Sequence, residues 1–490
     1  MSIERAESIC KCCAIPHVER AGSRRDFLVR AGGGFGAMAL WSLLARDADA
    51  RSRRGGVRNP VAAKPAPIPA KAKSVIWCFM DGGPSHLDLF DPKPMLAKLA
   101  GKPLPASFKR PITAMGKTAH TPLMASRRNF RRYGQSGIWV SDWYPEIAKC
   151  VDNMAMIQSV RANGLTHVAS VGQMNTGSIL AGRPSVGAWT LYGLGSECEN
   201  LPGFVVMTDY PRDPPGGSHN WGTGFMPATY EGTRFRAGKT PILNIAPPED
   251  YTPLEQRTEL DYIEQLDRRH SSLRREDDSL EARIAAYELA YQMQSAAPEV
   301  VDLSDETQET RRLYGLDQAD TADNARNCLI ARRLVEHGVR FVQLYMGSGS
   351  LWDAHTGLEE NHALHCCESD RPIAGLLRDL KRRGLLDSTL VIWGGEFGRT
   401  PMSESGTGRD HNPYGFSMWM AGGGVKPGTV YGATDEIGLY AIDHPAHIHD
   451  VHATILRLLG LNHETLTFQH NGRDERLTIT SGKVIGEIIA

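Results

Sequence analysis

Residues 75–86 read VIWCFMDGGPSH, an apolar run followed at once by an acid, two glycines, a proline, a serine and a histidine. The run has the length of a strand that is buried on both faces, and Asp81 follows it directly. Three further runs of strand length, at 154–160, 340–346 and 390–393, alternate with helical patterns. This alternation predicts an α/β fold with a mostly parallel central sheet and helices on both faces.

Acids and histidines follow several of these apolar runs, or stand just before another one. Because the carboxyl ends of parallel strands meet at one edge of a sheet, we expect such side chains to share one cleft. The residues concerned are Asp81, Asp353, His355, Glu396 and His411. Burying carboxylates and imidazoles together is costly unless a cation lies among them. The pattern therefore predicts one or two divalent metal ions, with zinc or manganese favoured over calcium, which prefers oxygen ligands alone.

The overall charge of the chain points to no polyanionic partner. The 490 residues carry 55 basic and 56 acidic side chains, a formal net charge of -1, so no long-range field attracts nucleic acid or an anionic membrane. A hydrophobic content of 41% is enough for a large core. Function must therefore be argued from a site, and we expect no nucleic-acid partner.

The first fifty residues have the pattern of an export signal. SRRDFL at 23–28 precedes a glycine-rich apolar run at 31–45 and the small-residue sequence Ala48-Asp49-Ala50, and this order resembles a twin-arginine signal. An amphipathic surface helix is the alternative. We expect residues 1–50 to engage the twin-arginine translocation machinery and to place the protein in the periplasm or otherwise outside the cytoplasm. No stable membrane insertion is expected after cleavage.

The rest of the chain divides into a linker and one folded domain. Residues 51–73 are rich in Arg, Pro, Ala and Lys without periodicity, so they predict an extended linker. The domain is expected to span 74–490. Within it, the charged stretch 253–297 predicts two helices that pack on the flank of the sheet, with a partner-binding arm as the alternative. Pro372 to Arg383 predicts a further helix.

Several longer motifs carry a resemblance to a known family. They are IWCFMDGGPSHLDLFDPKP at 76–94, WDAHTG at 352–357, TLVIWGGEFGRTP at 389–401, GRDHNP at 408–413 and HDVHATILRLLG at 449–460. Together they resemble the sulfatase-like family of proteins of unknown function DUF1501, within the alkaline phosphatase superfamily. The resemblance covers nearly the whole mature chain. It implies an alkaline phosphatase-like fold with two metal ions at the carboxyl edge of the sheet.

The resemblance also implies roles for the metal ligands. Asp81 matches the acid that binds the metal holding the nucleophile, and Glu396 matches a second acid motif of the superfamily. Asp353, His355 and His411 match the ligands of the other metal. The chain departs from the pattern at Phe397, where the superfamily has a histidine. One metal site is then weaker or missing, or His86 completes it.

The nucleophile is sought about ten residues before a Thr-Gly pair at a helix start, as in the superfamily. Thr176-Gly177 fits that pair, and counting back reaches Thr166, with His167 beside it and Ser170 one turn on. Thr166 is the first candidate and Ser170 the second, while His167 serves as a ligand or a base. A plain N-cap hydroxyl is the alternative for Thr166. No C-x-P-x-R motif of the ordinary sulfatases occurs.

These residues predict a metal-dependent hydrolase of phosphate or sulfate esters, acting on an anionic small-molecule or glycan ester. Arg399 and Arg409 could clamp the substrate anion, with surface salt bridges as the alternative. A second hypothesis is a non-catalytic exported protein that keeps the metal site and binds anionic glycans. A mutase or transferase shares the same two-metal chemistry and is the third.

Overall fold

The computed structural model describes residues 60–490 except 210–211, 237–241, 243–244, 246–250 and 274–277. Side chains 268 and 270–285 are also left out of the description. The predicted export signal at 1–50 and the first part of the predicted linker lie outside the described residues. Residues from Asn59 to Ala490 form one compact unit, and all that follows concerns this unit.

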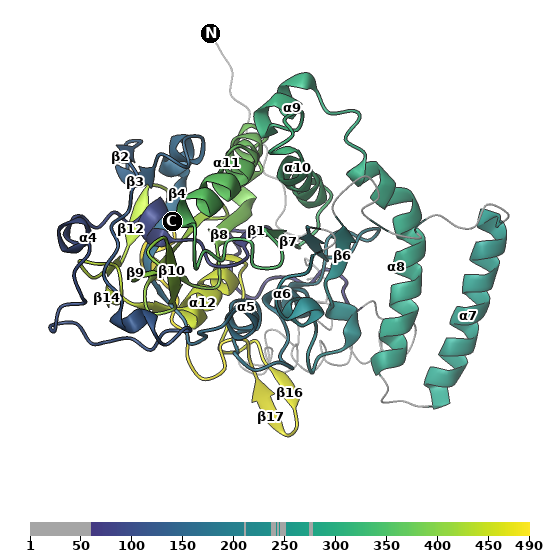
Figure 1. Cartoon of the computed structure of the whole chain (residues 1–490). Helices are drawn as coiled ribbons and strands as arrows, with labels where there is room; N and C mark the ends of the chain where they lie inside the picture. Colours follow the sequence, from purple (N-terminus) through teal and green to yellow (C-terminus); the bar gives the residue numbers. More distant parts are fainter. Residues whose placement is uncertain (1–59, 210–211, 237–241, 243–244, 246–250, 274–277) are drawn as a thin grey trace, which may run out of the picture. The chain divides into compact units, whose positions relative to one another are not determined.

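A nine-stranded sheet runs through the unit in the order β12-β4-β11-β8-β1-β7-β5-β6, with β15 paired to β4 (Figure 1). The strands are β1 (Ser74–Met80), β4 (Met154–Arg161), β5 (Phe204–Thr208), β6 (Thr233–Arg236), β7 (Phe341–Met346), β8 (Thr389–Gly394), β11 (Phe416–Ala421), β12 (Thr429–Tyr431) and β15 (Ala446–His447). Every ladder is parallel except the two made by β11. The predicted α/β fold with a mostly parallel sheet is confirmed.

The apolar runs became central strands because both of their faces are covered. Every residue of β1 is buried. Ile76 and Cys78 belong to one hydrophobic cluster, and Val75 and Trp77 to the other, as the alternation of side chains along a strand requires. β1 lies between β7 and β8, so Asp81 emerges near the middle of the carboxyl edge.

Helices cover both faces of the sheet. The first cluster contains residues of α8, α10 and α11, and the second contains residues of α5, α6 and α12. In Figure 1, α10 and α11 lie above the central strands and α5, α6 and α12 lie below them. The α-helices are α3 (His86–Leu89), α4 (Pro94–Leu99), α5 (His167–Thr176), α6 (Val186–Leu194), α7 (Pro253–Leu273), α8 (Asp278–Val301), α9 (Gln308–Tyr314), α10 (Ala322–Glu336), α11 (Leu358–Arg382) and α12 (Ile448–Leu458).

Four small hairpins complete the described strands. They are β2 (Phe130–Tyr133) with β3 (Ile138–Ser141), β9 (Gly398–Glu404) with β10 (Gly408–Asn412), β13 (Ala433–Thr434) with β14 (Ala441–Asp443), and β16 (Phe468–His470) with β17 (Arg473–Glu475). The β9–β10 hairpin matters most for function. It follows β8 closely in the chain and carries His411 back toward the sheet edge.

The helix predicted at 372–383 is wrong in its start, because α11 begins fourteen residues earlier, at Leu358. Pro372 lies inside this helix, where a proline lacks the N–H that would bond the carbonyl four residues before it. That carbonyl belongs to Glu368, and the side-chain amide of Asn324 donates to it at 3.1 Å. A neighbouring helix thus satisfies the group that the proline leaves, so the helix continues.

Residues 60–73, the described part of the predicted linker, contain turns and bends and no helix, and they are hydrogen-bonded to the folded unit. Lys64 N–H donates to the Leu194 carbonyl at 2.7 Å, and Ile68 N–H donates to the Gly460 carbonyl at 3.0 Å. Of the described cysteines, all are free thiols, and Cys367 alone is exposed. No helix among the described residues is both long and apolar enough to cross a bilayer.

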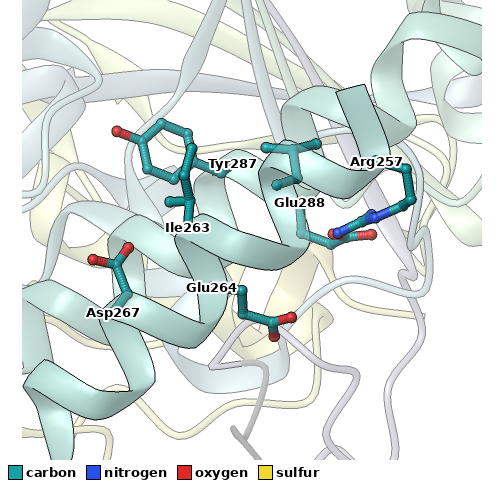
Figure 2. Close-up of a pocket in the computed structure, with 7 residues that line it drawn as sticks. Arg257, Ile263, Glu264, Asp267, Tyr287 and Glu288 are labelled. Carbon is teal, nitrogen blue, oxygen red and sulfur yellow. The ribbon is translucent and has the colours of Figure 1, made fainter. Parts of the chain in front are cut away.

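The two helices α7 and α8 occupy the stretch that was predicted to be helical, and α8 extends to Val301. Figure 2 shows the small pocket between them, lined by Arg257, Leu260, Ile263, Glu264, Asp267, Tyr287 and Glu288. An ion pair of 2.9 Å between Arg257 and Glu288 ties the helices together across it. The pocket contains no histidine or cysteine and shares no residue with the site described next.

Candidate metal centre

Three imidazoles and one carboxylate converge at the carboxyl edge of the sheet. One ligand atom from each of His167, Asp353, His355 and His411 can be chosen so that all four lie within 4.8 Å of one another. The residues come from the start of α5, the loop after β7 and the strand β10. Residues far apart in the chain therefore come together here, and Asp353, His355 and His411 among them were predicted as ligands.

Asp353 is the centre of this group. Its Oδ1 lies 3.1 Å from His355 Nε2 and 3.3 Å from His411 Nε2, and its Oδ2 lies 3.1 Å from His167 Nε2. Arg399 Nη2 also contacts Oδ1, at 2.8 Å. Burial alone would raise the pKa of Asp353, but the three imidazoles and Arg399 outweigh it and hold the pKa well below its usual value.

Two of the imidazoles are oriented by acceptors behind them. His355 Nδ1 contacts the Glu404 carboxylate, and His411 Nδ1 donates to the carbonyl of Leu165 at 2.7 Å. With a cation bound, the proton on Nδ1 would leave each Nε2 lone pair available to it, and the two Nε2 atoms lie 3.1 Å apart. This arrangement, in which an acceptor fixes the tautomer of a metal-binding histidine, is the usual one in protein metal sites.

A buried pair of acids lies beside this group. Asp81 is fully buried; its Oδ2 accepts from the N–H groups of Gly349 at 2.8 Å and Ser350 at 3.0 Å. Its Oδ1 is buried without a hydrogen-bond partner in the described part of the chain. Glu396 is also fully buried and accepts from the Gly82 N–H at 3.1 Å. Burial, and then the charge of Glu396, raise the pKa of Asp81 well above its usual value.

These features fit a divalent cation. A cation would supply the partner that Asp81 Oδ1 lacks and would neutralise the repulsion between the two acids. The mixture of imidazole and carboxylate donors suits zinc or manganese. The backbone beside Asp81 is closely packed: a Cβ added to Gly82, whose φ is +116°, would lie 2.6 Å from the Asp353 N atom. The glycine after Asp81 lets the two loops approach each other.

His167 links the two acidic parts of the site. Its Nδ1 lies 2.7 Å from Glu396 Oε1, while Nε2 faces Asp353. Burial would lower the pKa of His167, but its interactions with the carboxylates of Asp353 and Glu396 outweigh it and raise the pKa to about 9. In the metal-free protein, His167 is therefore protonated at neutral pH.

This raised pKa predicts a pH-dependent stability of the metal-free protein. The pKa of His167 lies at 6.5 in the unfolded chain and at about 9 in the folded one, so its stabilisation is complete below pH 6.5 and is lost as the pH rises toward 9. The loss is at most about 3.5 kcal/mol. Urea unfolding of the metal-free wild type and His167→Gln across this range measures it. Parallel curves for the two proteins would contradict the prediction.

The other predicted ligand, His86, lies elsewhere. Its Nε2 is 2.9 Å from the Gly438 carbonyl, and its Nδ1 accepts from the Arg399 N–H at 3.5 Å. Both ring nitrogens face backbone groups, and burial lowers the pKa of His86. The structure does not bring His86 into the group around Asp353, so it does not stand in for the histidine that Phe397 replaces.

The two arginines predicted to clamp a substrate are fully buried and have partners within the protein. Arg399 Nε donates to the Gly83 carbonyl at 2.8 Å, in addition to its contact with Asp353. Arg409 Nε pairs with Asp88 at 2.9 Å, behind the site. In this arrangement Arg399 positions Asp353, and Arg409 supports the hairpin. Neither the predicted clamp nor the predicted surface salt bridge describes these contacts.

The candidate nucleophiles differ in exposure. Thr166 is the exposed N-cap residue of α5, and its side chain makes no capping hydrogen bond. Thr166 directly precedes His167 at the positive end of the helix, where backbone N–H groups favour an anion. Ser170 is fully buried, and its hydroxyl has no partner among the described residues. Of the two hydroxyl-bearing candidates, Thr166 is therefore the one exposed to solvent.

Three residues of the site were not assigned these roles from the sequence. Glu404, at the end of β9, orients His355, and Asp410 joins Glu404 and His355 in a second acidic group. A neutral imidazole has one nitrogen lone pair, so His355 can bind a metal ion in only one of these two groups at a time. Phe397 stacks on His411, with ring centroids 4.2 Å apart, and lies 5.2 Å from His167. The sequence offered one signal for these roles: Glu404 and Asp410 lie on either side of a short turn that precedes His411.

Comparison with protein families gives one match that covers most of the chain. The model of the family described as "Protein of unknown function (DUF1501)" matches residues 72–489. No curated protein sequence matches the chain.

The chain is also similar to solved structures. The alkaline phosphatase from the Antarctic bacterium TAB5 is 11% identical, with a TM-score of 0.36 over 80% of this chain and 99% of that one. The PsFucS1 sulfatase from Pseudoalteromonas sp. is 12% identical, with a TM-score of 0.35 over 85% and 73%. The lipoteichoic acid synthase LtaP from Listeria monocytogenes is 9% identical, with a TM-score of 0.33 over 88% and 81%.

Proposed function

The chain belongs to the DUF1501 family of proteins of unknown function, and from this premise we propose that it is a metal-dependent hydrolase of phosphate or sulfate esters. The observation that carries the proposal is the meeting of Asp353 and three imidazoles, one of them from His167, which directly follows the exposed N-cap residue Thr166 in the chain. A group of metal ligands alone is also compatible with a metal ion that only stabilises the fold. A metal group next to a free hydroxyl at a helix N-terminus is suited to transfer of an anionic group.

The residues of the site have different proposed roles in metal binding and catalysis. Asp353, His355 and His411 would hold one cation, and the buried acids Asp81 and Glu396 provide ligands for a second. A bound divalent cation supplies Lewis-acid chemistry: it lowers the pKa of a nearby hydroxyl and neutralises an ester oxygen. The N–H groups at the start of α5 face an incoming anion. Thr166 is the nucleophile, and His167 holds a proton between two carboxylates.

Export is the other part of the proposal. The twin-arginine pattern at 23–28 supports folding and metal loading before translocation to the periplasm. Reporter fusion of residues 1–58 and of a variant with Arg24 and Arg25 changed to Lys tests it. Export of the reporter with both signals, or with neither, would contradict a twin-arginine route.

Removal of the metal is expected to destabilise the protein. Without a cation, Asp81 and Glu396 repel each other in a buried site, and an ion bound only by the folded state stabilises it by about 2.7 kcal/mol at a hundredfold excess over its Kd. Chelation should lower the Tm by several degrees, and zinc or manganese should restore it. Calorimetry with element analysis measures this. A Tm that neither chelator nor metal changes contradicts the metal centre.

Turnover separates the hydrolase from the non-catalytic glycan-binding protein. The metal-loaded wild type is tested with phosphomonoesters, phosphodiesters and aryl sulfates, and the chelated protein serves as the control. Metal-dependent release of phosphate or sulfate supports the hydrolase. Binding of sulfated or phosphorylated glycans without any turnover supports the binding protein instead, and transfer to an added alcohol in place of water supports a transferase.

A further inference from the structure

One segment of the domain has a charge that the whole chain conceals. Between Asp91 and Asp142 the sequence carries ten lysine and arginine residues and no acidic one, although basic and acidic residues are nearly equal in number over the chain. A balanced net charge gives no long-range field, but a local excess of cations attracts an anionic surface within about a Debye length, roughly 10 Å. Lys93 and Arg128 are paired with acids, and the other basic residues leave the segment with a local excess of positive charge.

Part of this segment, residues 108–117, forms a loop at the rim of the candidate metal centre; we call it the rim loop. The hydroxyl of Tyr440 donates to the Lys109 carbonyl at 2.9 Å, and that of Tyr414 donates to the Ile112 carbonyl at 2.9 Å. The N–H of Met115 donates to Asp410 Oδ2 at 3.0 Å. Because Asp410 immediately precedes His411, the loop is held next to the site.

The rim loop exposes apolar side chains among its cations. Ile112 is 73% exposed and Met115 is 50% exposed. The side chains of Lys109, Arg110 and Lys117 are also exposed, and none of them makes an ion pair in the part of the chain that the structure describes. Half-buried Phe108 packs into the small hydrophobic cluster beneath the loop. The loop is thus anchored, yet it presents apolar groups to the outside.

This combination fits one kind of partner better than others. Cations alone would serve any polyanion, but exposed apolar side chains gain most where an apolar phase lies behind the anions, as in a lipid layer. Single-stranded nucleic acid is bound on exposed aromatic rings, and the rim loop exposes none. The anionic headgroups and acyl boundary of a membrane surface match both features of the loop.

We propose that the rim loop docks the protein reversibly on an anionic lipid surface, with Ile112 and Met115 entering the boundary of the acyl chains. The cluster around Asp353 then faces esters displayed at that surface, and this second step rests on the proposed hydrolase function. The docking itself does not. Two apolar side chains and a few cations give weak, reversible binding rather than insertion.

Sedimentation with vesicles tests the docking without any turnover. The full-length protein is mixed with vesicles of phosphatidylcholine alone or with phosphatidylglycerol added. Wild type is expected to bind only the anionic vesicles. Ile112→Ser with Met115→Ser should weaken this binding about tenfold or more, and each of Lys109→Gln and Lys117→Gln about fivefold at low salt. Leu254→Ser is the matched control, because Leu254 is 77% exposed on α7, and it should bind like wild type.

Every variant carries the same N-terminal segment, so any binding by that segment is common to all of them. The variant that changes both Ile112 and Met115 therefore decides whether the rim loop binds the vesicles. Three results would each overturn the proposal: no binding to anionic vesicles, wild-type binding by the Ile112→Ser, Met115→Ser variant, or an equal loss in the Leu254→Ser variant. If only the charge variants lose binding, the segment is a general polyanion surface, and dextran sulfate should then compete with the vesicles. Thermal unfolding of each variant shows that the fold is kept.

Discussion

Replacement of Asp353 by Asn is expected to abolish high-affinity metal binding and to lower kcat/KM by more than the roughly 10–100-fold that outer partners of metal ligands cost. All three imidazoles of the cluster and Arg399 direct nitrogen atoms at the Asp353 carboxylate. An amide has the same shape but no charge, so a cation there loses its anionic ligand. Titration calorimetry with zinc and manganese, followed by steady-state kinetics, measures both effects.

The same substitution also changes the metal-free protein. Without the Asp353 charge, one of the two carboxylates that raise the pKa of His167 is gone, so the pKa falls from about 9 toward its ordinary value. The imidazole signals in an NMR pH titration report this shift. Because this measurement requires no metal, it tests the arrangement of Asp353 and His167 independently of which ion binds there.

Asp370 provides a matched control for Asp353. It is a buried acid that accepts from the N–H groups of Glu146 at 2.8 Å and Ile147 at 2.7 Å, and burial raises its pKa to about 6. Asp370→Asn should leave metal affinity at the wild-type level. If Asp370→Asn reduces metal affinity as much as Asp353→Asn, general destabilisation accounts for the loss and the cluster has no special role.

The residues at the carboxyl edge of the sheet could be predicted because the patterns that indicate them are local in the sequence. A buried strand such as β1 is a continuous apolar run, and the acid after it must emerge at the edge. The convergence of Asp81, Asp353 and Glu396 follows from strand direction alone. His411 was found for a related reason, since it stands just before the apolar run of β11.

The misplaced residues depend on packing that no local pattern carries. His86 follows β1 as closely as a ligand would, but the backbone of Gly438, from a distant loop, takes its Nε2. Arg399 and Arg409 look like anion binders, yet the pairing of β9 with β10 folds both inward. Glu404 became the partner of His355 through the same hairpin. Hairpin register and loop approach decide these roles, and neither could be read from spacing.

Thr166→Ala is expected to reduce kcat by about a thousandfold or more, the scale on which loss of a covalent nucleophile acts. Thr166 is an exposed residue that directly precedes His167, at the N-terminus of α5. An N-cap threonine usually contributes about 0.5–2 kcal/mol to stability, but this one makes no capping hydrogen bond, so the variant should unfold like wild type. Metal affinity should also stay unchanged, because no ligand is removed.

Ser170→Ala distinguishes the two hydroxyl candidates. Ser170 is fully buried and its hydroxyl lacks a partner among the described residues, so its loss removes an unsatisfied polar group and should leave kcat unaltered while stability holds or rises slightly. Thr166→Ser should retain part of the activity, because it keeps a hydroxyl at the same backbone position. Full activity in Thr166→Ala would exclude Thr166 as nucleophile. If Ser170→Ala then loses activity without loss of stability, the buried hydroxyl must become accessible when substrate binds.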